Sequence, residues 1–500
     1  MRTKRAVYST LTSLVLQVTT IVCGFILPRL IIGTFGSATN GLIVSVSQFL
    51  GYIALMESGI GAVTMTALYK PLATKDIHEV SAIVRAAEIF FKKIAVLFLF
   101  YAVILATFFQ LISNTEFDFL FTFSIVMIIA SGIFARYYFG VTYSLLLQAE
   151  QKKYIVFNIN IVTLILNVIF CTTFIHFGFG IHAVKLMSMS VFLLRPIFLN
   201  WYVKRHLNIR KDVKPNNGAL KQRWDGLGHH IAYFLQTNTD VMVLTFFAGL
   251  KEVSIYSVYL LVANGMRQII KAFSGGIGAA FGNIIAKEEK KILQKNFNLY
   301  ELTIHTLIVT LLAVAIILIN PFIELYTVNM TDVNYVQPLF GFMLLLAVAI
   351  YCIRLPYSTI IFASGHFKQT KRAAYIEAFL NVILSIIFIQ FWGIIGIALA
   401  TVIANTYRVI DLAYYASKNM IYRSMGSFIK RQFVSASNLL FIVLTIRWLS
   451  LSLYFNSYLV FFTTAFVILI ISGIMTLVFS MIFYGEMLRM LLKKFKLLKN

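Results

Sequence analysis

Long runs of apolar residues, separated by short polar gaps, extend along the chain from Ala6 to Tyr484. Each run has roughly 20 to 30 residues, which is enough for a tilted helix to cross the bilayer core. Transmembrane β-strands would be about ten residues long and would alternate in polarity, which these runs do not. We therefore predict fourteen transmembrane helices, at residues 6–33, 40–69, 88–112, 118–148, 154–177, 179–205, 226–248, 253–285, 297–320, 336–364, 370–391, 393–417, 428–453 and 457–484.

Positive charge is concentrated in alternate gaps between these runs. Of the 43 Lys and Arg residues, nine lie inside predicted helices away from their cytoplasmic ends, and Lys251 lies in one of the other gaps. The remaining 33, among them the cluster from Lys418 to Arg431, lie in alternate gaps, in the helix ends that border these gaps, and at the two ends of the chain. Because Lys and Arg resist translocation, this alternation predicts that both termini are cytoplasmic. Topology thus explains most of the net charge of +24, and we expect no nucleic-acid partner.

The composition excludes several other classes of protein. Only 12% of the residues are charged, against about 25% in soluble domains. The three cysteines lie inside predicted helices without a C-x-x-C pair, so we expect neither a disulfide nor a zinc or other metal site. The chain also lacks G-x-x-x-x-G-K-[ST] and H-E-x-x-H, and its outer gaps are short. We predict no enzyme activity and no cofactor.

Four short matches, in the same order, relate the two halves of the chain. The matched positions are Gly59–Ala62 with Gly276–Ala279, Asn167–Ile169 with Asn381–Ile383, Arg195 with Arg408, and Gly36 with Gly249, at separations of 217, 214, 213 and 213 residues. They predict an internal duplication of six-helix halves, 1–210 and 226–420, joined by a cytoplasmic linker at 211–225. An even number of helices gives both halves the same orientation, as in transporters that rock two bundles about a central site. Helices at 428–484 are additional, and the basic amphipathic tail, 485–500, is expected on the inner leaflet.

Nine cations lie inside the predicted helices away from their cytoplasmic ends, and these carry the functional argument. They are Arg29, Arg136, Lys185, Arg195, Arg267, Lys271, Arg354, Arg408 and Arg447. A charge at the bilayer centre costs roughly 2.5–3.5 kcal/mol on the mildest scale, so these residues must snorkel, pair with an acid or line water. We predict that Arg136, Arg267, Lys271 and Arg354 line a shared aqueous cavity. The expected ligand is an anion, and guanidinium groups suit phosphate.

The other cations have alternative explanations. Arg29 and Lys185 lie close to outer helix ends, where snorkelling is the simpler interpretation. Arg408 and Asp411 are three residues apart and can neutralise each other. Arg29, Arg195 and Arg408 are therefore secondary candidates for the cavity. For Arg447, outside the duplication, we predict a structural role.

Few acids are available inside the predicted helices. Glu57 and Asp240 are candidates for coupling transport to an H⁺ or Na⁺ gradient. The alternative is a structural pair, which for Glu57 would be with Arg267 or Lys271. Glu377 has the same two interpretations. We expect His305 to be a hydrogen-bonded packing residue and His229 and His230 to lie at the membrane interface.

The helix layout, the Glu57–Gly61 segment and the two Asn-Val-Ile segments resemble a known family. It is the polysaccharide transporter branch of the multidrug/oligosaccharidyl-lipid/polysaccharide exporter superfamily, which includes O-antigen and capsule repeat-unit flippases. The resemblance implies translocation of undecaprenyl-diphosphate-linked oligosaccharides across the bacterial cytoplasmic (inner) membrane. It also implies a polysaccharide polymerase or glycosyltransferases as partners. A diphosphate cargo agrees with the excess of cations.

Two further functions stay open at this point. Many members of that branch have twelve helices, whereas fourteen also occur in the related lipid II flippases, so a flippase for the peptidoglycan precursor is the first alternative. A non-transporting scaffold of a polysaccharide synthesis complex is the second. The multidrug branch is disfavoured because organic-cation substrates require an acidic cavity.

Overall fold

A computed structural model describes residues 2–113, 115–210, 212–220, 238–274, 277–449 and 455–497. Every regular element in these ranges is a helix, and they contain no strand. Ten of the helical segments are long and apolar enough to cross a membrane. The predicted fold class, an all-α integral membrane protein, is confirmed.

The ten segments correspond to the fourteen predicted helices in a simple way. Predicted helix 40–69 is divided into α2 (Ser37–Leu50), the 3₁₀ turn η1 (Gly51–Ile53) and α3 (Ala54–Thr74). Helix 253–285 corresponds to α10 (Leu250–Ser274) and α11 (Ile277–Ala286), and residues 275–276 between them lie outside the described ranges. Most of 226–248 lies outside the described residues, although 238–247 are helical. The predicted pair 370–391 and 393–417 forms α15 (Phe367–Ala416), in which Gly393 leaves the helical conformation at φ 54°.

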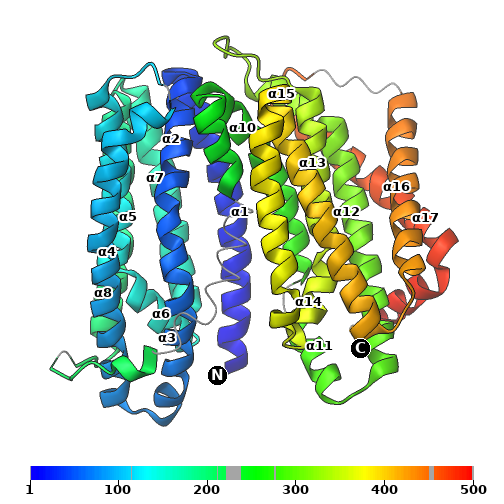
Figure 1. Cartoon of the computed structure of the whole chain (residues 1–500), viewed down its shortest axis with the longest axis horizontal. Coiled ribbons are helices and arrows are strands. Elements are labelled where there is room, and N and C mark those ends of the chain that lie inside the picture. Colours follow the sequence, from blue (N-terminus) through cyan, green and yellow to red (C-terminus); the bar gives the residue numbers. More distant parts are fainter. Residues whose placement is uncertain are drawn as a thin grey trace. The chain divides into compact units, whose positions relative to one another are not determined.

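The first compact unit is Met1–Ser257. It contains α1 (Arg2–Phe35), α2, α3, α4 (Ile77–Ser113), α5 (Phe119–Phe139), α6 (Val141–Ala149), α7 (Lys153–His176), α8 (Ile181–His206), a 3₁₀ turn η2 (Asn217–Leu220) and the start of α10. Helix α5 packs against α4 and α8, and α7 packs against α1 and α8 (Figure 1). Their apolar core includes Phe91, Phe109 and Val126, which are fully buried.

The second compact unit is Val258–Asn500. It contains the rest of α10, then α11, α12 (Lys290–Tyr326), α13 (Pro338–Ile353), α14 (Leu355–Ala363), α15, a π-helical turn η3 (Ser417–Ile421), α16 (Met425–Trp448) and α17 (Tyr458–Leu497). Helices α16 and α17 are the predicted additional pair, and both pack against α12. The pair therefore docks on one helix of the unit.

The backbone itself recurs along the chain. Eight of the ten described residues with positive φ form pairs separated by 213 to 215 residues: Gly36 with Gly249, Lys75 with Glu288, Gln151 with Gly365, and Gly178 with Gly393. Helices α6 and α14, both nine residues long, also start 214 residues apart, at Val141 and Leu355, each directly after a helix break. Sequence matches and backbone turns thus support the same duplication, whose domain boundaries stay a prediction.

A close helix contact inside the first unit gives a test of the packing. A Cβ atom on Gly41 of α2 would lie 1.8 Å from the carbonyl oxygen of Leu250, whereas one on Gly24 of α1 would meet nothing within 4 Å. We expect Gly41→Ala to destabilise the protein by about 1–3 kcal/mol, as overpacking typically does. Thermal unfolding of the detergent-purified protein should show a lower Tm for Gly41→Ala and a Tm at or above wild type for Gly24→Ala. Equal Tm values for the two variants would contradict this packing.

Candidate functional site

The first unit encloses a cavity of about 560 Å³ between α3, α5, α6, α7 and α8. Its charged lining residues are Glu57, Arg136, Lys185 and Arg195. Ser144, Gln148, Asn160 and Ser188 add uncharged polar groups, and apolar side chains complete the wall. The lining of this cavity therefore contains three cations and one carboxylate.

A helix break places two of these cations. Arg136 occupies the last turn of α5, and Gly140 separates α5 from α6. A Cβ atom on Gly140 would lie 3.2 Å from the Cβ atom of Pro196, a tight contact that marks the close approach of α8 to the break between α5 and α6. Arg195 directly precedes Pro196 and is thereby brought to the same cavity as Arg136.

Arg136 is paired but accessible. Its Nη2 atom lies 3.2 Å from Oε2 of Glu57, and the hydroxyl of Tyr137 donates a hydrogen bond of 2.5 Å to the same oxygen. The Arg136 side chain is nevertheless 63% exposed. Because solvent-accessible ion pairs are weak, Arg136 can exchange Glu57 for a different anion. Within the first unit, Glu57 is thus paired with Arg136, whereas its pairing with Arg267 or Lys271 of the second unit stays a prediction.

Arg195 keeps its charge in the cavity. Its Nε donates a 2.7 Å hydrogen bond to the hydroxyl of Thr163, and its guanidinium lies 4.3 Å from the centre of the Phe192 ring. Both contacts fix the side chain, and neither neutralises it. Lys185, for which the sequence favoured snorkelling, also lines this cavity.

The other three primary candidates converge on one aromatic ring in the second unit. The distances to the centre of the Tyr351 ring are 4.0 Å from the Arg354 guanidinium, 4.9 Å from the Lys271 ammonium and 5.6 Å from the Arg267 guanidinium. Such contacts are attractive because the ring face is negative. The prediction that Arg136 shares a cavity with these three residues stays a prediction.

Arg354 and Arg408 belong to a buried chain of charges. Arg354 Nη1 lies 2.6 Å from Oε1 of Glu377, and Arg408 Nε lies 3.5 Å from Oε2 of the same carboxylate. Arg408 also pairs with Asp411 at 3.1 Å. Arg354 and Arg408 are thus held mainly by acids of their own unit.

Two of the remaining candidates, Asp240 and Arg29, belong to the first unit. Asp240 is buried and accepts a 2.8 Å hydrogen bond from the Tyr256 hydroxyl. Arg29 is half-buried on α1, beside Pro28, and is not among the residues that line the cavity of the first unit. His229 and His230 lie outside the described residues.

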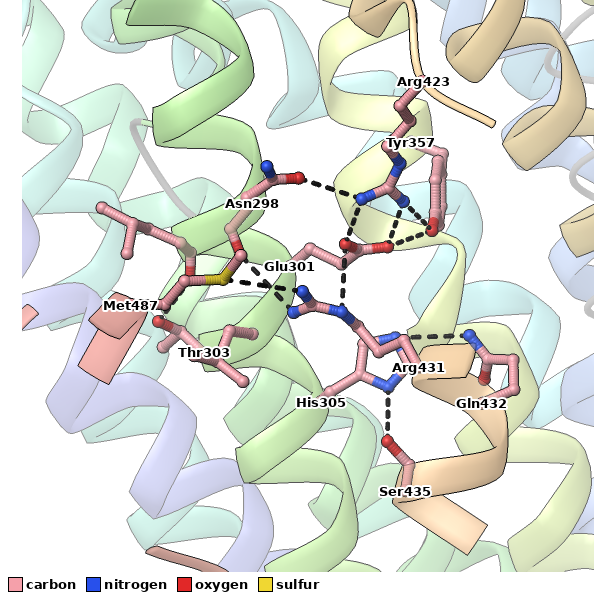
Figure 2. A network of polar contacts seen from close by, with 12 residues as sticks. Asn298, Glu301, Thr303, His305, Tyr357, Arg423, Arg431, Gln432, Ser435 and Met487 are labelled. Atoms are coloured by element: carbon pink, nitrogen blue, oxygen red, sulfur yellow. Dashed lines mark hydrogen bonds and ion pairs between the residues drawn. The ribbon is translucent and has the colours of Figure 1, made fainter. Parts of the chain in front are cut away.

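The sequence argument missed a third group of charges, which Figure 2 shows. Glu301 of α12 is fully buried, and both of its oxygens bind Arg423, at 2.6 and 2.7 Å. Arg431 of α16 approaches the same carboxylate to 3.3 Å, and the Tyr357 hydroxyl of α14 donates to it. We had assigned Arg423 and Arg431 to a cytoplasmic gap as markers of topology. That interpretation is incomplete, because both side chains pair with a buried acid.

This Glu301 network joins the additional helices to the rest of the second unit. The guanidinium of Arg431 lies 4.7 Å from the centre of the Tyr484 ring of α17, so Arg431 links α12, α16 and α17. Burial lowers the pKa of Arg423, but its hydrogen bond to Glu301 and the charge of that acid outweigh this effect and raise the pKa above its ordinary value. His305, one turn beyond Glu301, is hydrogen-bonded to Ser435 at 3.0 Å. The signal in the sequence was Glu301 itself, an acid inside predicted helix 297–320.

Comparison with solved structures identifies the fold. No protein-family model matches the sequence, and a search of curated proteins found no match. The lipid II flippase MurJ in an inward-closed conformation matches with a TM-score of 0.71 at 18% identity, covering 96% of this chain and 99% of that chain. An inward-facing multidrug resistance transporter of the MATE family of the MOP superfamily matches with a TM-score of 0.65 at 14% identity, covering 82% and 98%. This chain has the fold of these exporters.

A third solved structure has the same fold. It is a MOP superfamily transporter from Pyrococcus furiosus whose binding pocket is described as reversed in polarity, with a TM-score of 0.57 and 14% identity over 85% of this chain and 97% of that chain. At such identities the likeness concerns the fold. Within that fold, the MurJ match extends over more of this chain than the MATE match, 96% against 82%.

The Glu301 network gives a prediction for stability. Glu301→Gln leaves two buried guanidinium groups without their carboxylate, and breaking a buried pair in this way costs about 3–5 kcal/mol. We expect a large drop in Tm in detergent, together with loosening of α16 and α17 in hydrogen exchange. Asp411→Asn is the matched control, because Arg408 keeps Glu377 as a partner. A wild-type Tm for Glu301→Gln would show that the network does not stabilise the unit.

Proposed function

We propose that the protein is a flippase that moves undecaprenyl-diphosphate-linked oligosaccharide repeat units across the bacterial cytoplasmic membrane. The observation that carries this proposal is the cavity of the first unit, with three cations against one carboxylate. A volume of about 560 Å³ is within the range of sites for small molecules, roughly 300–1,000 Å³. Arginine forks match phosphate oxygens, and uncharged polar groups such as Gln148 and Asn160 can bind sugar hydroxyls.

The mechanism that we propose is alternating access. The polyprenyl tail stays in the bilayer, because lipid already solvates this hydrocarbon chain. The charged headgroup crosses through a hydrated path between two rocking bundles. Arg136, Lys185 and Arg195 would bind the diphosphate in the first unit. Arg267, Lys271 and Arg354, gathered at Tyr351, are the corresponding candidates in the second. Glu57 and Asp240 keep their proposed role in coupling to an H⁺ or Na⁺ gradient.

A lipid II flippase is the second candidate function. It is favoured by the MurJ match, which extends over 96% of this chain. Both candidates carry a diphosphate on a polyprenyl tail, and they differ in the sugar and peptide beyond it. We propose cytoplasmic termini for either function, and partners among polysaccharide polymerases or glycosyltransferases for the first.

The cavity cations should be required for translocation. We expect Arg136→Gln and Arg195→Gln each to slow headgroup translocation in proteoliposomes by about tenfold or more, because one lost hydrogen bond to a charged group costs about 1.5–3 kcal/mol. Arg205→Gln is the matched control, since Arg205 lies on the same helix as Arg195 and over an aromatic ring, Trp201 at 5.6 Å, but outside the cavity. Repeat-unit and lipid II substrates should be compared in the same assay. Wild-type rates for both cavity variants would overturn the proposed function.

Glu57 should compete with the cargo for Arg136. Replacing it by Gln removes the negative charge while the side chain keeps an oxygen for the Tyr137 hydroxyl. Because an accessible ion pair is worth about 0.2–1 kcal/mol, affinity for inorganic pyrophosphate should rise roughly two- to fivefold in calorimetric titration. Glu150→Gln, which removes the acid of the Glu150–Lys152 pair at 2.6 Å, should leave the affinity unchanged. Weaker pyrophosphate binding by Glu57→Gln would mean that Glu57 helps the anion to bind.

A further inference from the structure

A groove on the surface of the first unit is lined by two lysines, one tyrosine and otherwise apolar side chains. It has a volume of about 530 Å³ and lies along α4, with Tyr138 of α5 as one wall. Its floor is apolar and includes Val96, Leu97 and Phe100, of which Phe100 is 66% exposed. Lys92 and Lys93 also line the groove, between Ile89 and Val96 along α4. The groove thus combines two positive charges with a surface of hydrocarbon.

The position of the two lysines along α4 places them at a membrane interface. Residues 77–91 of this helix contain Glu79, Arg85 and Glu88, whereas no charged residue occurs between Ile94 and Leu111. That uncharged segment has 18 residues and a length of roughly 27 Å at 1.5 Å per residue, close to the thickness of the bilayer core. The lysines therefore lie where phosphate groups of lipids are found, with the apolar floor beneath them.

Helical periodicity aligns the charge with the floor. Lys92, Val96 and Phe100 are four residues apart, so they form one stripe of α4. The Lys92 ammonium lies 5.2 Å from the centre of the Tyr138 ring, a contact that positions it without neutralising it. Within the described ranges, neither Lys92 nor Lys93 takes part in an ion pair. Both charges are available to an anion from outside the chain.

We propose that this groove binds an anionic glycerophospholipid of the cytoplasmic leaflet. The headgroup phosphate would contact Lys92 and Lys93, and an acyl chain would lie along Val96, Leu97 and Phe100. Clusters of basic residues on the cytoplasmic side of transmembrane helices attract anionic lipids. A peptide is a poor occupant, because an apolar floor at membrane depth cannot satisfy its backbone N–H and C=O groups. This inference is independent of the cargo of the transporter.

Fluorescence quenching tests the site. In Phe100→Trp, the new indole reports on the lipid in the groove, and the unsubstituted protein in parallel samples gives the signal of the four native tryptophans. We expect brominated phosphatidylglycerol to quench this indole at several-fold lower mole fraction than brominated phosphatidylcholine. Adding Lys92→Gln and Lys93→Gln should abolish the preference. Adding Lys418→Gln should preserve it, since Lys418 also lies over a tyrosine, at 5.7 Å from Tyr414, but not in the groove.

Three results would overturn the proposal. The first is equal quenching by the two lipids in vesicles that differ only in headgroup. The second is a preference that survives the double lysine replacement. The third is displacement of brominated phosphatidylglycerol by a lower mole fraction of undecaprenyl diphosphate, which would make the groove a site for the carrier lipid. Because both lysines are exposed, unchanged Tm values for the variants will separate loss of binding from loss of folding.

Discussion

An arginine inside a membrane needs a carboxylate or water, and this requirement divides the cations of the chain into two groups. In the second unit, single carboxylates hold pairs of arginines: Glu301 binds Arg423 and Arg431, and Glu377 binds Arg354 and Arg408. These side chains are buried, and their removal from water is repaid only by close pairing. In the first unit, Arg136 is largely exposed and Arg195 has a hydroxyl as its partner, so water or a ligand must complete their solvation. Arg136 and Arg195 of the first unit are thus better placed to bind an anion than these four buried arginines.

The same requirement explains how the additional helices are attached. Helices α16 and α17 pack mainly on α12, and Arg431 provides a specific contact between them through Glu301 and the Tyr484 ring. Apolar contacts between helices in a membrane gain little from the hydrophobic effect, because lipid tails are equally apolar. A polar contact therefore fixes the pair more specifically than its leucines and phenylalanines can.

The apolar runs predicted the helices because hydrophobic length alone determines whether a segment crosses a bilayer. They did not predict the break at Gly140, inside the run 118–148, whereas at Arg354, inside the run 336–364, the neighbouring Pro356 permits a bend. The break at Gly140 accompanies the close approach of Pro196, a residue on another helix. Likewise, the sequence shows most of the charged residues inside the helices, but it does not show which of them pair. The pairs Glu57–Arg136 and Glu301–Arg423 join residues 79 and 122 positions apart. No local pattern contains such pairs, which is why Arg423 and Arg431 were interpreted only as markers of topology.

A transporter must bind its cargo and then release it, so the strength of its ion pairs matters as much as their number. Glu301 is fully buried and binds Arg423 through both of its carboxylate oxygens. An anion from outside could not replace this carboxylate. In the Glu57–Arg136 pair, one guanidinium nitrogen contacts the two carboxylate oxygens at 3.2 and 3.5 Å, and the arginine side chain is 63% exposed. The energy of this pair is comparable to that of the contacts that would replace it. Under the proposed function, a diphosphate would enter by displacing Glu57 and leave when Glu57 returns, while rigid pairs elsewhere keep the helices in place.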